Sequence, residues 1–168
     1  MARSSGYSVQ LVLGSLASFP GLVARDSLEL RRERLGRLFW LCDGHSYMVF
    51  RETVRPLPVR ERTVIEVGFR LRLIGSAPAP HWLFQRLCIL TTPFWSGFEG
   101  FGTKLWMVDP STRSYAGIYQ WGSHRAARAY LGTLLPILRA VSVPGSVFSE
   151  VHPGRELTPF LERRAAPG

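Results

Sequence analysis

The sequence predicts an α+β fold in which two βαβ halves build one antiparallel sheet. Three observations predict it. Residues 103–121 hold two β-rich segments joined by a turn, a helical pattern follows from residue 124, and a further β-rich segment ends near residue 151. Upstream, residues 63–90 show the same order of strand and then helix. Together they give the βαββαβ order of ferredoxin-like domains.

The composition fits a single domain with a substantial core. The chain has 168 residues, of which 46% are hydrophobic and 12% aromatic. Its net charge is +9, and lysine and arginine together number 21, yet Lys104 is the only lysine and asparagine is absent. This bias is typical of a GC-rich coding genome, so the charge is a weak sign of nucleic-acid binding. We expect no nucleic-acid partner.

Neither the cysteines nor the apolar runs indicate a cofactor or a membrane. Cys42 and Cys88 lie beside apolar residues, without CxxC or His/Cys metal spacing. We therefore expect buried free thiols, a cytoplasmic protein, and no metal, flavin or haem. The first apolar run is broken by Gly14 and Pro20, which argues against a signal peptide. No run approaches the ~20 apolar residues of a membrane span.

Residues 1–60 are predicted to form an N-terminal extension made of a helix and a strand. Asp26 or Ser27 can cap a helix through residues 29–42, in which the leucines and Phe39 fall near one face. Residues 45–54 alternate and are rich in β-formers, which predicts a strand. Residues 55–62 contain two prolines and are expected to be a linker.

The main domain, residues 61–155, is predicted to contain four strands and two helices. In chain order we expect a strand at 63–75, a helix at 81–90, strands at 103–109 and 114–121, a helix from His124 and a strand at 141–151. Ser123 can cap the second helix, and Pro136 is expected to bend or stop it. Residues 156–168 are a polar tail with room for one short helical turn.

The segment around this hairpin resembles a known family. The pattern is GFxxKLW before the hairpin, AGIYxW after it, AxAYL in the helix and GSVF at the last strand. It resembles the YdhR-type monooxygenases of the dimeric α/β-barrel superfamily, which also holds antibiotic-biosynthesis monooxygenases and small polyketide cyclases. The matching residues are Gly100, Phe101, Lys104, Leu105, Trp106, Gly117, Ile118, Tyr119, Trp121, Ala127, Ala129, Tyr130, Leu131, Gly145 and Phe148. The resemblance covers residues 63–152 and leaves residues 1–60 outside it.

This resemblance implies a dimeric barrel and a small-molecule enzyme. Two sheets would pair into a barrel, and each subunit would keep a pocket between sheet and helices. The implied function is a cofactor-independent tailoring enzyme of aromatic or polyketide-type natural-product biosynthesis, a monooxygenase acting through a substrate carbanion. Two alternatives are a polyketide cyclase, or another ring-closing pericyclic or aldol enzyme, and a non-catalytic binding protein.

The expected partners are an aromatic or polyketide-like small molecule and a second copy of the chain. A sheet with helices on one face leaves its other face apolar, and a second subunit can cover it. Alternatively, the strand at 45–54 caps a sheet edge or fills this role within one chain.

Four residues are candidates for chemistry: His45, His81, Lys104 and Tyr119. Lys104 or Tyr119 could stabilise an enolate or phenolate, and His45 or His81 could take a phenolic or carbon-acid proton. The alternative for Lys104 is a solvated strand lysine, and for each histidine it is an ordinary structural role.

Five further residues are candidates for substrate binding: Trp106, Trp121, Trp95, Phe94 and Arg70. The aromatic residues could form or close a flat pocket, and Arg70 could hold an anion. Core packing is the alternative for the aromatics and solvent exposure for Arg70. Side chains two residues apart on a strand share a face, but the strand register is left open.

Overall fold

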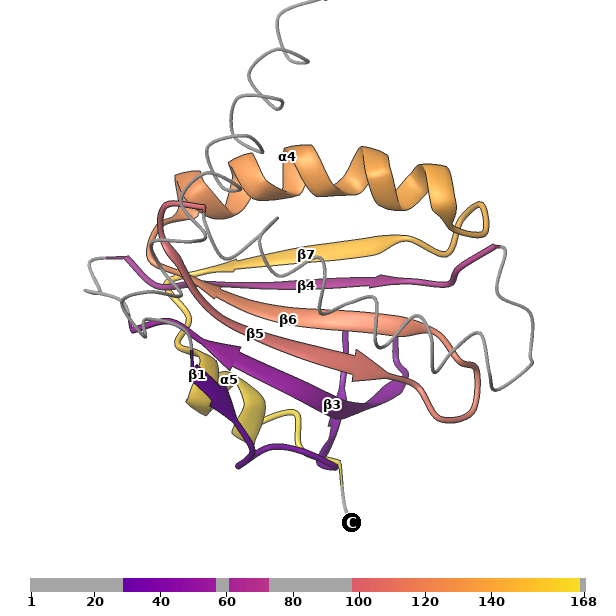
Figure 1. Cartoon of the computed structure of the whole chain (residues 1–168), viewed down its shortest axis with the longest axis horizontal. Coiled ribbons are helices and arrows are strands. Elements are labelled where there is room, and N and C mark those ends of the chain that lie inside the picture. The colour runs from indigo at the N-terminus through magenta and orange to yellow at the C-terminus, as the bar shows by residue number, and fades with distance from the viewer. Residues whose placement is uncertain (1–28, 57–60, 73–97, 167–168) are drawn as a thin grey trace, which may run out of the picture.

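The computed structural model describes residues 29–56, 61–72 and 98–166. Its described elements are β1 (Glu29–Arg31), β2 (Leu38–Trp40), β3 (Ser46–Val54), β4 (Thr63–Phe69), β5 (Phe101–Val108), β6 (Tyr115–Trp121), α4 (His124–Val141), β7 (Phe148–Pro153) and α5 (Leu157–Glu162). The strands form one sheet in the order β1-β3-β5-β6-β4-β7, and β2 also pairs with β3 (Figure 1).

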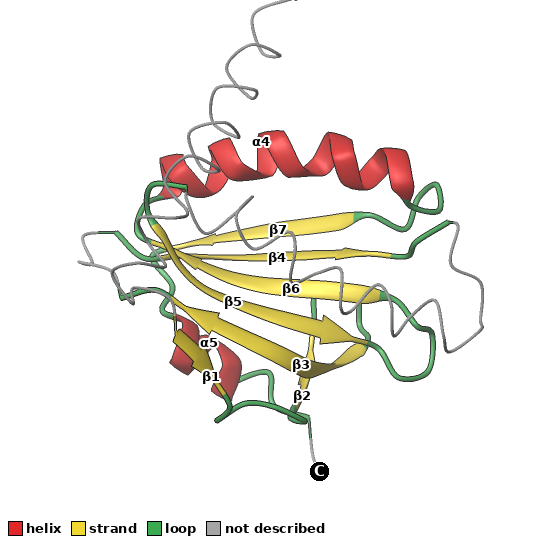
Figure 2. Cartoon of the chain, viewed as in Figure 1, coloured by secondary structure: helices red, strands yellow, loops and turns green. Residues whose placement is uncertain are grey.

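The four central strands confirm the predicted fold class. Strands β4 and β5 both run antiparallel to β6, and β6 and β7 both run antiparallel to β4. β4 and β5 are therefore parallel to each other, and so are β6 and β7. Two parallel strands need a crossover connection. Helix α4 makes the crossover from β6 to β7 (Figure 2). The order β5-β6-β4-β7 is that of a ferredoxin-like sheet.

The predicted strand of the N-terminal extension adds to this sheet at its edge. Strand β3 begins one residue later than predicted and pairs antiparallel with β5. The register shifts between Val49 and Arg51, where a bulge inserts an extra residue. Of the alternatives that the sequence left for this strand, capping of a sheet edge is confirmed.

Helix α4 covers one face of the sheet. The Ser123 side chain accepts a hydrogen bond from the Ala126 N–H at 3.1 Å, as expected for an N-cap. The helix continues past Pro136 to Val141, so this proline does not stop it. Pro136 is exposed, and water can satisfy the carbonyl that its missing N–H leaves without a partner. The buried face of α4 presents Ala127, Tyr130 and Leu131 to the sheet.

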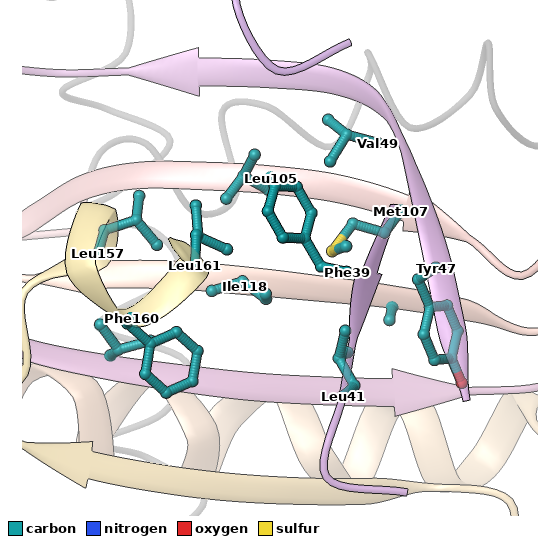
Figure 3. Close-up of a cluster of buried hydrophobic side chains, with 12 residues drawn as sticks. Phe39, Leu41, Tyr47, Val49, Leu105, Met107, Ile118, Leu157, Phe160 and Leu161 are labelled. Atoms are coloured by element: carbon teal, nitrogen blue, oxygen red, sulfur yellow. The ribbon is translucent and has the colours of Figure 1, made fainter. Parts of the chain in front are cut away.

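The opposite face carries a second hydrophobic cluster, which is covered by β2 and α5 (Figure 3). Its members are Phe39, Leu41, Tyr47, Val49, Val64, Leu105, Met107, Ala116, Ile118, Leu157, Phe160 and Leu161. The short helix expected in the tail is confirmed as α5. Among the described residues, neither helix has the length and apolar character that a membrane span requires.

The helix predicted over residues 29–42 is wrong, because this segment forms β1 and β2 instead. Gly36 adopts a φ of 78°, which interrupts any helix through the segment. Beyond it, Phe39 and Leu41 are buried while Trp40 between them is exposed, which is the alternation of a strand. Pairing with β3 decides the structure over local helix propensity.

The last strand of the main domain is shorter than predicted. Strand β7 begins at Phe148 rather than at residue 141, because Pro144 and Gly145 make a turn in which Gly145 has a φ of 79°. The predicted helix at 81–90 lies outside the described residues, as do residues 73–75 of the first predicted strand.

Candidate functional site

One row of side chains crosses three strands on the α4 side of the sheet. Thr53 of β3 lies directly opposite Lys104 of β5, and Lys104 lies directly opposite Tyr119 of β6. Direct partners in a sheet point to the same face. The register that the sequence left open therefore puts Thr53 and Tyr119 on the strands to either side of Lys104, with all three side chains on one face.

The ammonium of Lys104 is buried against aromatic rings. The residue is only 4% exposed, and its Nζ lies 3.1 Å from the centroid of the Trp106 ring and 4.7 Å from that of Tyr119. Cation–π attraction holds an ammonium at such a distance and is stronger where water is excluded. The predicted alternative of a solvated strand lysine does not fit this burial.

The ring of Tyr130 on α4 packs against the ring of Tyr119. Their ring centroids are 5.3 Å apart, and Tyr130 also lies 4.9 Å from the Trp121 ring. Burial raises the pKa of Tyr130 well above its usual value, and the neighbouring Tyr119 raises it further. The Tyr130 hydroxyl therefore keeps its proton over the physiological range and can act as a hydrogen-bond donor.

A glycine lets the aromatic side chains approach one another. Gly117 lies directly opposite Trp106 on the neighbouring strand. A Cβ at Gly117 would lie 2.8 Å from a ring carbon of Tyr119, so the tyrosine ring occupies the space that a side chain would fill. Because Gly117 has no side chain, the Tyr119 ring can lie beside Trp106 and Lys104.

Two buried polar atoms on this face have no hydrogen-bond partner among the described residues. They are the Thr53 hydroxyl oxygen and the indole nitrogen of Trp121. A buried polar group without a partner costs free energy, and such groups need a specific explanation. A bound molecule with polar groups would satisfy them. Sequence reasoning missed Thr53, because nothing in the pattern of residues 45–54 distinguishes it from an ordinary strand residue.

The structure brings together Lys104, Tyr119, Trp106 and Trp121, but not His45 or Arg70. His45 lies at the far end of β5, with its Nδ1 3.5 Å from an Asp109 carboxylate oxygen. At ~3.3 Å per strand residue, Asp109 is roughly 16 Å from Lys104. Arg70 is exposed beyond the end of β4, as its alternative interpretation expected. His81, Phe94 and Trp95 lie outside the described residues.

A second polar cluster, which the sequence analysis missed, lies on the face away from α4. Glu66 is fully buried, and its Oε1 is 2.8 Å from His152 Nε2 and 2.9 Å from the Arg164 guanidinium. Its Oε2 accepts a hydrogen bond from the Cys42 N–H at 3.0 Å. Glu66 is the only charged residue among the apolar residues 64–67 of the predicted strand. This pattern could have indicated the cluster, since a buried carboxylate needs partners.

The Cys42 thiol lies near this cluster, although the residue is exposed rather than buried as predicted. Ligand atoms of Cys42, Glu66 and Glu150 all fall within 4.8 Å of one another. Partial burial, Glu66 and a hydrogen bond with Glu150 raise the pKa of the Cys42 thiol to about 12. Because Arg164 and His152 already engage Glu66, we interpret the cluster as an ion-pair network rather than as a metal centre.

No known protein family and no curated protein matches the sequence. Comparison with solved structures finds distant similarities. One is a ferredoxin-fold protein related to antibiotic biosynthesis monooxygenases from Listeria monocytogenes, with 13% identity and a TM-score of 0.47 over 84% of this chain and 89% of that one. A monooxygenase-like protein from Listeria innocua has 11% identity and a TM-score of 0.49, over 84% and 89%.

A third solved structure is SnoaB, a cofactor-independent oxygenase from Streptomyces nogalater. It has 24% identity and a TM-score of 0.40, over 59% of this chain and 97% of that one. Similarity at these levels is no guide to activity.

Proposed function

We propose that the protein is a cofactor-independent monooxygenase that oxidises an aromatic or polyketide-like small molecule through a substrate carbanion. The observation that carries this proposal is the buried Lys104 ammonium, which lies against the rings of Trp106 and Tyr119 in the row of side chains that also contains Thr53. A fixed cation and flanking donors, away from water, stabilise a negatively charged oxygen far better than solvent-exposed groups do.

The chemistry requires such an oxyanion. A phenol or anthrone that loses a proton becomes a phenolate or enolate, whose negative charge is shared between an oxygen and a carbon. Lys104 would stabilise the charge on oxygen while dioxygen reacts at carbon. One oxygen atom of dioxygen would end as the new carbonyl, and the other would leave as water with the two hydrogens that the substrate loses. An anthrone loses both from the reacting carbon, whereas a phenol loses one from that carbon and one from its hydroxyl.

The base that removes the first proton is not among the described site residues. His45 is too far from Lys104 to serve the same substrate atom, by the distance along β5. His81 remains the predicted base. Trp106 would supply an apolar ring for an aromatic substrate directly beside the lysine ammonium, whereas Trp121 is packed in the core against Phe98, Phe101 and Tyr130.

Dioxygen uptake by the purified protein tests the proposal. A panel of anthrones, naphthols and polyketide-like phenols would be supplied in the presence of a chelator, and uptake would be followed with an oxygen electrode. We expect uptake with at least one aromatic substrate and incorporation of label from isotopically labelled dioxygen into the product.

The same experiment separates the alternatives. A ring-closed product without dioxygen uptake would replace the monooxygenase with a cyclase, in which Lys104 stabilises the enolate of an aldol-type closure. Binding of the panel members without any product would support the non-catalytic alternative and contradict an enzyme.

A further inference from the structure

The sheet face that points away from α4 is closed by two segments of the same chain, residues 32–45 and 155–166, which we call the cap. An isolated antiparallel bridge joins the two segments, with Phe39 opposite Ala165. The Trp40 N–H donates to the Arg164 carbonyl at 2.8 Å, and the Ala166 N–H donates to the Leu38 carbonyl at 3.0 Å. Residues from both ends of the described chain therefore form one layer.

The cap buries the apolar surface of the central strands. Phe39 and Leu41 from one segment, and Leu157, Phe160 and Leu161 from the other, pack on the sheet (Figure 3). Beneath them, the sheet side chains of Val64, Leu105, Met107 and Ile118 are completely buried. An apolar sheet face left open would require another molecule to cover it, and here the chain's own residues do so.

The charges of the cap match those of the face beneath it. The carboxylates of Glu52 on β3 and Glu66 on β4 are both fully buried on this face. Each pairs with an arginine of the cap, Glu52 with Arg34 and Glu66 with Arg164. Replacing the cap by another surface would leave two buried carboxylates without these partners, which is strongly unfavourable.

The sheet also caps the helix that covers it. The side-chain oxygen of Gln120 on β6 accepts a hydrogen bond from the Leu157 N–H at 2.9 Å, at the first turn of α5. The neighbouring Glu156 forms an ion pair with Arg62. Apolar packing, three ion pairs and a helix cap thus connect the cap to the rest of the chain, which is the complementarity of an intramolecular interface.

We infer that the cap takes the place of a second subunit, so that the protein is a monomer. This replaces the expected homodimer, which rested on the family resemblance and on an apolar face that a second copy would cover. The inference is independent of the proposed reaction, since it concerns the opposite face of the sheet.

Sedimentation equilibrium of the full chain, from roughly micromolar to a hundred times that concentration, tests the inference directly. We expect one species with the mass of a single chain, 18.9 kDa, throughout. A dimer at any of these concentrations would overturn it.

A pair of matched variants tests whether the cap is held as described. Arg164→Met leaves buried Glu66 without its guanidinium, so we expect a thermal midpoint lower by about 5 °C or more and increased binding of a hydrophobic dye. Arg163→Met, at the adjacent exposed position, should resemble the wild type. If Arg164→Met also resembled the wild type, the ion pair between Arg164 and Glu66 would not stabilise the cap, and the inference would fail. If Arg164→Met did not fold, the mass of the wild-type protein in sedimentation equilibrium would still test whether it is a monomer.

Discussion

Lys104 and Tyr119 are direct partners across β5 and β6, so the lysine ammonium and the tyrosine phenol lie on the same face of the sheet. This relationship joins the only lysine of the chain to the aromatic layer under α4. It also makes the site testable with single substitutions, because the lysine contacts rings from two strands and the tyrosine contacts a ring from the helix.

Removing the charge at Lys104 should abolish most of the activity without unfolding the protein. We expect Lys104→Met to lower kcat/KM by about 10²-fold or more, because one stabilising group for the oxyanion is lost. The thermal midpoint should change little, since methionine fills a similar volume among the rings. Arg70→Gln, at an exposed position, is the control and should keep full activity. Full activity in Lys104→Met would remove the lysine from the mechanism.

Removing the hydroxyl of Tyr119 should reduce turnover more than removing that of Tyr130. Tyr119→Phe deletes a donor beside the Lys104 ammonium, and we expect a loss of kcat on the order of 10²-fold. Tyr130→Phe deletes a hydroxyl from the next layer, so its effect should be several times smaller. Steady-state kinetics of both variants check this order, and the reverse order would put Tyr130 rather than Tyr119 at the reacting oxygen.

Two glycine substitutions should change the free energy of unfolding in opposite directions. A Cβ at Gly68 would lie 2.1 Å from the Phe148 ring, so Gly68→Ala should destabilise the fold by about 1–3 kcal/mol. A Cβ at Gly132, on the exposed side of α4, would contact nothing within 4 Å, so Gly132→Ala should stabilise it by roughly 0.5–1 kcal/mol. Denaturant unfolding measures both, and a Gly68→Ala protein as stable as the wild type would contradict the packing of β7 on β4.

The Cys42 thiol should react slowly with alkylating reagents in spite of its exposure. Its pKa of about 12 leaves much less thiolate at neutral pH than an ordinary cysteine has, so alkylation should be slower by roughly 10³-fold. The raised pKa also means that the thiol form contributes stability below pH 9, which is lost as the pH rises toward 12. Mass spectrometry of alkylated Cys42 against pH checks the rate, and a midpoint near pH 8 would show that Glu66 and Glu150 do not act on the thiol.

The central sheet was predictable because its signals are local. The β-forming residues of 114–121, the turn before them and the Ser123 cap are each recognised from a few neighbouring residues. The N-terminal extension was harder. Residues 29–42 carry helix-forming leucines and arginines, and only pairing with β3 and with Ala165 makes strands of this segment. Such partners are distant in sequence and leave no local pattern.

The candidate site was predictable in part for the same reason. Spacing of two residues showed that Lys104 and Trp106 share a face, as do Tyr119 and Trp121. Whether these pairs share the same face depended on the register between β5 and β6, which the side chains of one strand do not reveal. The bulge at residue 50 likewise sets which residue of β3 lies opposite Lys104, and it brings Thr53 there.

The most direct test of the oxyanion site is the pKa of a bound phenol. Absorbance titration of 2-naphthol in complex with the wild-type protein and with Lys104→Met distinguishes the phenol from the phenolate without any turnover. We expect the wild type to lower the apparent pKa of the bound naphthol by about one unit or more, and Lys104→Met to bind it without this shift. A bound naphthol whose pKa is unchanged in the wild type, or equally lowered in both proteins, would contradict an oxyanion site at Lys104.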